Sequence, residues 1–195
     1  MHIEEGFLLS RARTYPKFRR KPFELNEMGA PDKELVKSGR MNPKGMPVLY
    51  LASSIESAIS EVKPWSGATV AVGKLVINRP AKLLDLSKNS NTSDYGDAPA
   101  LYLHNSLSES AFFGQLSSAA HPDDDLAYIS TQFIADLIKA HDYDGIVFLS
   151  SQIRGEKNYV FFDPKIADCI EIKNFKICSV RYQHQDSLML GNSVF

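Results

Sequence analysis

Short apolar runs separated by turn-forming residues dominate this sequence, and they limit its possible folds more than any other feature does. The clearest run covers residues 69–78, where β-branched residues alternate with other types. Shorter runs at 6–13, 48–52, 146–149 and 159–163 also have the length and composition of strands. Because each run is too short to bury an apolar face alone, the runs are expected to pair into one sheet.

Three further segments complete the expected strands. One is a short strand at 82–86. The other two, 170–172 and 175–182, alternate in polarity and are expected to form a final hairpin.

Two segments have helical periodicity. Apolar residues recur at i, i+3, i+4 and i+7 within 55–62, and either Ser53 or Ser54 is expected to cap this helix. A second helix is expected from Ser130, as its cap, to about His141. Several strands with few helices between them indicate the α+β class, with a mixed or antiparallel sheet flanked by short helices.

The length and composition fit one domain. The chain has 195 residues, of which 44% are hydrophobic, and we expect a single domain over 1–195 with its core at about 6–182. Residues 15–37 are polar and broken by prolines, so a loop with short helical pieces is expected there. Residues 87–127 are expected to form a polar insertion, with one or two short helices at 100–113.

Charge and composition argue against several classes of function. The formal net charge is −1, so the chain has no global basic field, and we expect no direct binding of nucleic acid. The N-terminus lacks the features of a signal peptide, and no apolar run reaches the roughly 20 residues of a membrane span. We therefore expect a cytoplasmic protein. Cys169 and Cys178 lack metal-ligand spacing, so no metal site is expected.

Three residues in the first third of the chain can contribute to a binding site. Arg40 lies in a turn rich in Gly and Pro, from which a guanidinium can grip phosphate oxygens, although a surface Arg in a turn is the simpler interpretation. Tyr50 ends an apolar strand and can either face a planar ligand or belong to the core. Glu61 falls at the flank of the apolar stripe of its helix, where a carboxylate is either solvated or able to stabilise a sugar cation.

Two adjacent serines follow the strand at 146–149. A hydroxyl of Ser150 or Ser151 can bond a ribose or a carboxamide, or simply cap the next turn. No histidine has a spacing that indicates a Ser-His-Asp triad, and neither a dinucleotide-binding glycine motif nor a P-loop is present.

Taken together, these blocks resemble the RES domain family. The segment GRMNPKGMPVLYLA at 39–52 matches the signature of that family, and Glu61 follows at the usual distance. The C-terminal block YDGI at 143–146, with Ser150 and the later Asn158, also matches. The resemblance extends from Arg11 to Phe162 and therefore covers most of the chain.

The resemblance implies a fold and an activity. The fold would be like that of ADP-ribosyltransferases, in which NAD⁺ sits in a cleft of a split sheet. The activity would be that of a bacterial toxin that degrades NAD⁺ by hydrolysis or phosphorolysis of its nicotinamide–ribose bond. NAD⁺ would be a substrate and phosphate a co-substrate in the second case, and no prosthetic group is implied. An antitoxin of the Xre type would be the protein partner, and a homodimer is left open.

The resemblance also assigns roles to individual residues. Arg40 would bind the NAD⁺ phosphates, Tyr50 would pack on the nicotinamide side, and Glu61 would stabilise the oxocarbenium-like transition state. Ser150 would bond the ribose or the carboxamide; the choice of Ser150 over Ser151 rests on counting back from a later asparagine.

Two further positions bear on the comparison with the family. Arg11 resembles an arginine near the start of many members that assists with phosphate, although Arg13 competes for that assignment. Met41 stands where many members have Trp, so one wall of the pocket is expected to differ. Two alternatives stay open at this point: a mono-ADP-ribosyltransferase that modifies a protein, and a binding module without enzymatic activity.

Overall fold

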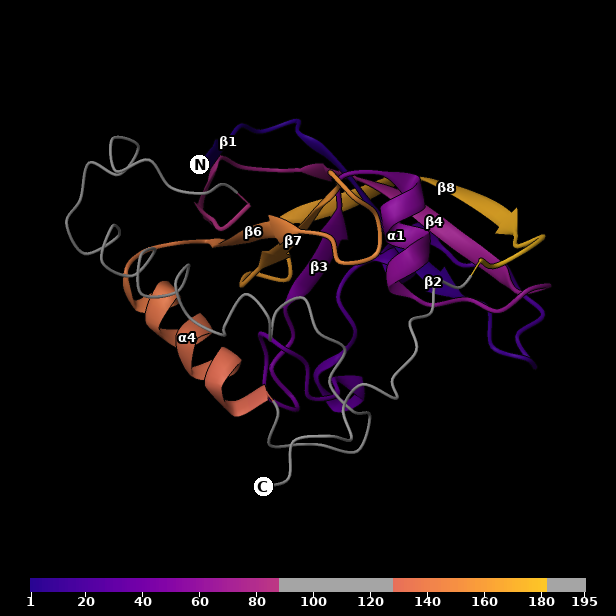
Figure 1. Cartoon of the computed structure of the whole chain (residues 1–195), viewed down its shortest axis with the longest axis horizontal. Coiled ribbons are helices and arrows are strands. Elements are labelled where there is room, and N and C mark those ends of the chain that lie inside the picture. Colours follow the sequence, from indigo (N-terminus) through magenta and orange to yellow (C-terminus); the bar gives the residue numbers. More distant parts are fainter. Residues whose placement is uncertain (88–127, 182–195) are drawn as a thin grey trace, which may run out of the picture.

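The structure is a computed structural model of the chain, and it describes residues 1–87 and 128–181. The described residues form an open sheet with two α-helices beside it, which is the α+β class that the sequence indicates (Figure 1). Most of the expected polar insertion at 87–127, including the helices expected at 100–113, lies outside the described residues.

The described residues contain eight strands and two α-helices. The strands are β1 (His2–Ile3), β2 (Leu8–Thr14), β3 (Leu49–Ala52), β4 (Thr69–Ile77), β5 (Ala81–Asp85), β6 (Gly145–Leu149), β7 (Lys157–Phe161) and β8 (Ala167–Lys176). The helices are α1 (Ile55–Glu61) and α4 (Ile129–Ala140), with short 3-10 turns η1 (Leu25–Met28) and η2 (Lys33–Leu35). No helix among the described residues has the length and apolar character needed to cross a membrane.

All eight strands belong to one mixed sheet, in the order β1-β5-β6-β7-β3-β2-β4-β8. Only β5 and β6 run parallel; every other neighbouring pair is antiparallel. The long central strand β4 pairs with β2 on one side and with β8 on the other, and Figure 1 shows these strands together at one end of the molecule.

The sheet is split between β2 and β3. These two strands are paired at a single position, Ser10 opposite Ala52, whereas β2 and β4 are paired over seven positions. Beyond Ser10 the two strands diverge and leave backbone groups and side chains of both strands accessible. The split sheet that the sequence analysis expected is therefore present.

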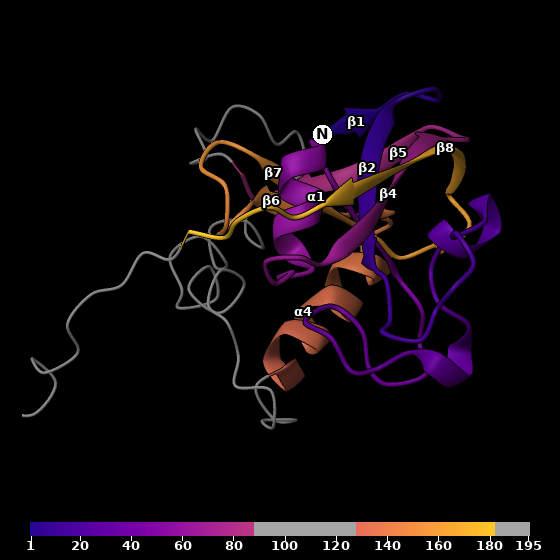
Figure 2. The same ribbon diagram turned by 90° about the vertical axis from the view of Figure 1, so that its right-hand side faces the viewer.

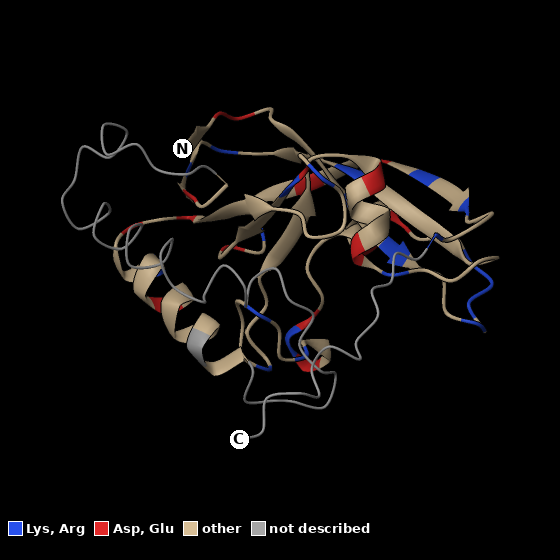
Figure 3. Cartoon of the chain, in the orientation of Figure 1, with Lys and Arg blue, Asp and Glu red and all other residues tan. Residues whose placement is uncertain are grey.

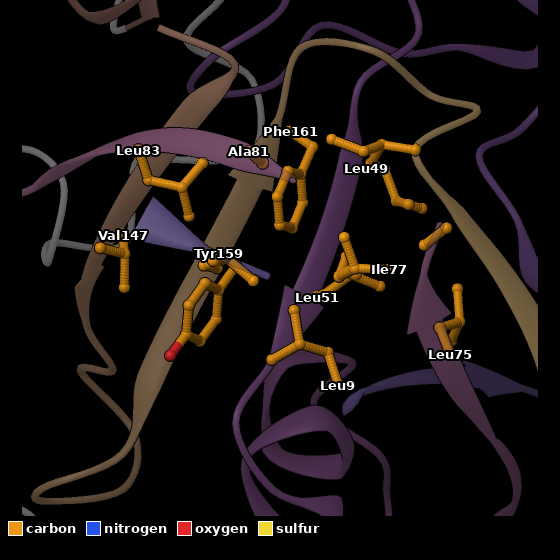
Figure 4. Close-up of a cluster of buried hydrophobic side chains, with 13 residues drawn as sticks. Leu9, Leu49, Leu51, Leu75, Ile77, Ala81, Leu83, Val147, Tyr159 and Phe161 are labelled. Carbon is orange, nitrogen blue, oxygen red and sulfur yellow. The ribbon is translucent and has the colours of Figure 1, made fainter. Parts of the chain in front are cut away.

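One face of the sheet encloses the larger apolar core. Side chains from β2 to β7 converge there, as Figure 4 shows for Leu9, Leu51, Ile77 and Phe161, all nearly inaccessible to solvent. This burial provides the main stabilisation of the fold, at roughly 25 cal/mol for each Å² of apolar surface removed from water.

Both α-helices lie on the opposite face, at different ends of the sheet (Figures 1 and 2). Tyr50 packs against the cluster that contains α4, and Ala52, two residues later on the same face of β3, packs against Ala58 of α1. Neither helix covers the part of β3 that lies between them, and a cleft can form there.

Most expected elements are confirmed, and the strand at 146–149 and the helix at 55–62 are found almost at the expected bounds. The hairpin at 170–172 and 175–182 is wrong: 167–176 is one continuous strand. β4 supplies a continuous partner for it: Lys173 and Asn174, where the turn was expected, pair in regular register with Val72 and Ala71.

Two smaller expectations at element ends are also corrected. Ser54, and not Ser53, caps α1 by accepting a hydrogen bond from the backbone of Ser57. Ser130 is not the cap of α4, because the helix already begins at Ile129, after Tyr128. The strand β1 was not expected, since two residues give no readable periodicity.

Replacement of Gly145 by Ala tests how tightly β5, β6 and β7 are packed. A Cβ at this position would overlap the carbonyl oxygen of Val160 and lie 3.0 Å from Cδ2 of Leu83. We expect Gly145→Ala to lower the free energy of unfolding by about 3 kcal/mol, because a backbone must shift. Gly29→Ala is the control, since its Cβ would meet nothing closer than 3.7 Å. Equal urea midpoints for the two variants would contradict the packing described.

Candidate active site

A cavity of about 360 Å³ opens where β2 and β3 diverge. Its walls come from both strands, from the end of α1 and from the turn that carries Arg40. The resemblance gives a site role to five residues, and all of them except Ser150 line the cavity: Arg11, Arg40, Tyr50 and Glu61. The volume is within the range of small-molecule sites.

Arg40 is at the tip of a tight turn formed by residues 39–42. The backbone N–H of Gly39 donates to the carbonyl of Asn42 at 2.9 Å, and the reverse bond is 3.3 Å long. A Cβ on Gly39 would lie 2.6 Å from Oδ1 of Asn42, so only glycine permits this approach. Glycine is thus required at position 39 because the side chain of Asn42 packs against it.

The side chains of the two residues that follow Arg40 in this turn point inward. Asn42 is buried, and its amide donates to the carbonyls of Lys37 and Pro43. Met41 is buried in the core with Ile138 and Leu84 and does not line the cavity. The expectation that Met41 changes a pocket wall is therefore wrong: its side chain anchors the turn to the core.

Tyr50 joins this turn to the sheet. Its hydroxyl donates to Oδ1 of Asn42 at 2.9 Å and accepts from the backbone N–H of Met41 at 3.1 Å. Burial raises the pKa of Tyr50 to about 12, so the phenol keeps the proton with which it binds Asn42. The ring lines the cavity while the hydroxyl holds the turn, so both interpretations of Tyr50 from the sequence describe part of its position.

Arg11 forms part of the cavity wall from the opposite strand. Its guanidinium donates to the carbonyls of Gly29 and Met28, and Arg13 donates to the same Gly29 carbonyl at 2.9 Å. Burial, and then the like charge of Arg13, lowers the pKa of Arg11 to about 9. No carboxylate among the described residues pairs with Arg11, so an anion in the cavity would relieve an unfavourable positive charge.

Glu61 lines the same cavity from the last turn of α1. Its Oε1 accepts from Nδ2 of Asn158 at 2.7 Å and lies 3.4 Å from Oγ of Ser150. Within the described part of the chain, no group donates to Oε2, so this oxygen is available to a ligand. Hydrogen bonds to Oε1 thus orient the carboxylate, and Oε2 can contact a ligand.

The structure distinguishes the two adjacent serines. Ser150 is buried beside Glu61, and its Oγ also accepts from the backbone N–H groups of Gln152 and Ile153. Ser151 is exposed, and its hydroxyl accepts a hydrogen bond from the side chain of Gln152. Ser150 is behind the carboxylate and not in the cavity wall, so it contacts the site through Glu61.

Asn158 is a site residue to which the sequence analysis gave no role of its own. It lines the cavity, is buried, and holds Glu61 through its Nδ2, while its Oδ1 is buried without a hydrogen-bond partner in the described structure. An unpaired buried amide oxygen is costly unless a ligand donates to it. Its match to the C-terminal block of the family is the sequence signal that could have found it, because its place two residues before a buried Val does not separate it from a core position.

The charges of the site are arranged by sign. Figure 3 shows basic residues on β2 and acidic residues on the adjacent α1. Of the charged residues in this region, Arg11, Arg40 and Glu61 line the cavity. A ligand with anionic groups near the arginines and a cationic group near Glu61 would match this arrangement.

Comparison with known proteins identifies the family. A model of the RES domain family matches residues 9–184, which is most of the chain. The chain belongs to the RES domain family. No curated protein matches the RES domain described here. Among solved structures, a chain in the crystal structure of the M. tuberculosis MbcT–MbcA toxin–antitoxin complex has 12% sequence identity and a TM-score of 0.48. That alignment covers 89% of this RES domain chain and 87% of the other chain.

Replacement of Asn158 by Asp tests the contact with Glu61 without any assay of function. The change would place two carboxylates at a distance where Asn158 now donates at 2.7 Å, which raises the pKa of the pair in the folded state. Stability conferred by a raised carboxyl pKa is present at low pH and is lost as the pH rises. We therefore expect the melting temperature of Asn158→Asp to fall below that of the wild type by several degrees more at pH 8 than at pH 4.

Asn174→Asp is the matched control for this experiment, because Asn174 is exposed and its side chain accepts a hydrogen bond from the hydroxyl of Tyr15, away from Glu61. If both variants lose the same stability at both pH values, Asn158 does not hold Glu61 as described.

Proposed function

We propose that this RES domain cleaves the nicotinamide–ribose bond of NAD⁺ and acts as the toxin of a toxin–antitoxin pair. The observation that carries the proposal is the oriented carboxylate of Glu61 in the same cavity as Arg11 and Arg40. NAD⁺ has two phosphates and a cationic pyridinium joined by a ribose, which fits a site with positive groups on one side and a carboxylate on the other. Membership of the family supports the toxin role.

Cleavage of the nicotinamide–ribose bond requires one main contribution from the protein, which is a negative charge near the anomeric carbon. As the C–N glycosidic bond breaks, its electron pair goes to the nicotinamide nitrogen, which becomes neutral, and positive charge develops on the anomeric carbon. Oε2 of Glu61 stabilises that charge, and because Asn158 and Ser150 fix Oε1, the carboxylate needs no reorientation.

The remaining groups bind and orient the dinucleotide. Arg40, on its rigid turn, binds the pyrophosphate, and the positive charge of Arg11 supports it from β2. The ring of Tyr50 provides a flat wall for the nicotinamide side, and the unpaired Oδ1 of Asn158 accepts a hydrogen bond from a ribose hydroxyl or the carboxamide.

The product depends on the acceptor. Attack by water at the anomeric carbon releases ADP-ribose, nicotinamide and one proton, whereas attack by phosphate releases nicotinamide and the 1-phosphate of ADP-ribose. We further propose that an antitoxin of the Xre type covers the cleft.

Release of nicotinamide by the purified chain tests the proposal. Glu61→Gln is expected to lower kcat/KM by about 10²–10³-fold, because it removes the charge and keeps the shape. Ser150→Ala should lower it by roughly tenfold, since it loosens Glu61, and the neighbouring Ser151→Ala should leave it within about twofold of wild type. Far-UV circular dichroism and melting curves check that each variant is folded.

Product analysis with and without phosphate separates the acceptors. Free ADP-ribose indicates water, and its 1-phosphate indicates phosphate. Label from NAD⁺ on a protein band would instead support a mono-ADP-ribosyltransferase. No release of nicotinamide under any of these conditions would overturn the proposed reaction and favour a binding module.

A further inference from the structure

The turn that carries Arg40 is held by α4 as well as by β3. Oγ1 of Thr131, in the first turn of α4, donates to the backbone carbonyl of Arg40 at 2.5 Å. The next residue, Gln132, points its amide nitrogen at the same turn from about 90 residues further along the chain.

Nε2 of Gln132 lies within hydrogen-bond distance of three oxygens. These are Oγ of Ser38 at 3.0 Å, the carbonyl of Gly39 at 2.9 Å and the carbonyl of Asn42 at 3.0 Å. An amide NH₂ has two hydrogens, so the three oxygens share them. Two of the three are carbonyls, which only accept, so a donor is required at this position.

Gln132 and Tyr50 hold different sides of the turn. The hydroxyl of Tyr50 contacts the side chain of Asn42 and the N–H of Met41, whereas Gln132 contacts the carbonyls of Gly39 and Asn42, which also close the turn on themselves. The Gly39 carbonyl belongs to the peptide that leads into Arg40, and the Asn42 carbonyl accepts the hydrogen bond that closes the turn. A change at either end of the turn therefore alters the backbone from which the Arg40 side chain projects.

We propose that Gln132 is a positioning residue for Arg40: by donating to the carbonyls of Gly39 and Asn42, at the two ends of the turn that carries Arg40, Gln132 fixes the direction from which the guanidinium meets the phosphates of the substrate. This inference rests on the proposed function for the identity of the ligand. A preformed guanidinium loses less conformational freedom on binding, so Gln132 contributes to affinity for the dinucleotide without contact with it.

The effect is expected in binding and not in bond cleavage. The phosphates are remote from the C–N bond that breaks, so disorder of Arg40 weakens the ground state and the transition state equally. Loss of Gln132 should therefore raise KM for NAD⁺ and leave kcat nearly unchanged. A change that merely damaged the fold would lower the amount of active protein, and hence kcat, at unchanged KM.

Two replacements of Gln132 test the donor requirement. Gln132→Glu keeps the shape but places acceptors against two carbonyl oxygens, and we expect KM for NAD⁺ to rise about tenfold. Gln132→Lys keeps donors at a similar reach, so it should stay within about threefold of the wild-type KM. Lys139→Gln is the control, because it makes the same change of charge as Gln132→Glu on an exposed position of the same helix.

Hydrogen–deuterium exchange of residues 38–42 provides a readout that does not depend on turnover. The amide of Gly39 bonds the carbonyl of Asn42, which Gln132 also contacts, so exchange should be faster in Gln132→Glu than in wild type or in Lys139→Gln. Faster exchange with a raised KM supports the proposal. If Gln132→Glu matches Lys139→Gln in KM and in exchange, the proposal is overturned.

The same measurements separate this inference from the proposed function. A wild-type protein that releases no nicotinamide contradicts the proposed reaction, whatever the exchange shows. A wild-type protein that consumes NAD⁺, together with an unaffected Gln132→Glu variant, contradicts only the role of Gln132.

Discussion

The sheet is joined across its middle by one pair of residues, Ser10 of β2 and Ala52 of β3, and the candidate site depends on that narrow connection. If the two strands were paired along their whole length, the backbone of each would be covered and the cavity between α1 and the Arg40 turn would close. The strands lose backbone hydrogen bonds where they separate. The long ladders of β4 with β2 and β8, and the core on the other face, stabilise the sheet in their place. The pairing that is absent here is thus as important to the site as the pairing that is present.

Rigid supports surround each charged group at this opening. Glu61 is held through one oxygen by Asn158, and the turn of Arg40 is held by Tyr50 and by Thr131 of α4. Electrostatic stabilisation is effective when the charged groups are already in place before the reaction begins. Holding a charge in place before the ligand binds also has a cost. The lowered pKa of the buried Arg11 reflects a positive charge that is unfavourable until an anion binds.

The sequence analysis succeeded where local chemistry decides the structure. Alternation located β4, and the helical spacing after Ser54 located α1 with Glu61 at its flank. It failed where a contact between distant segments decides. The segment 167–176 is a single strand because β4 extends beside it, and Met41 points into the core because α4 and β5 enclose it there. Neither partner can be identified from neighbouring residues, and the same holds for the contacts of Gln132 with the turn of Arg40.

The site is assembled from both ends of the fold. Arg11 lies on β2 near the start of the chain, whereas the amide that orients Glu61 comes from β7, and α1 itself has seven residues, too few to persist alone in water. During translation, a ribosome-bound chain that has not yet released Asn158 therefore lacks the group that holds the carboxylate. If the chain cleaves NAD⁺ as proposed, nascent chains and chains truncated before Asn158 would lack the assembled site and would not deplete the NAD⁺ of the cell that makes them.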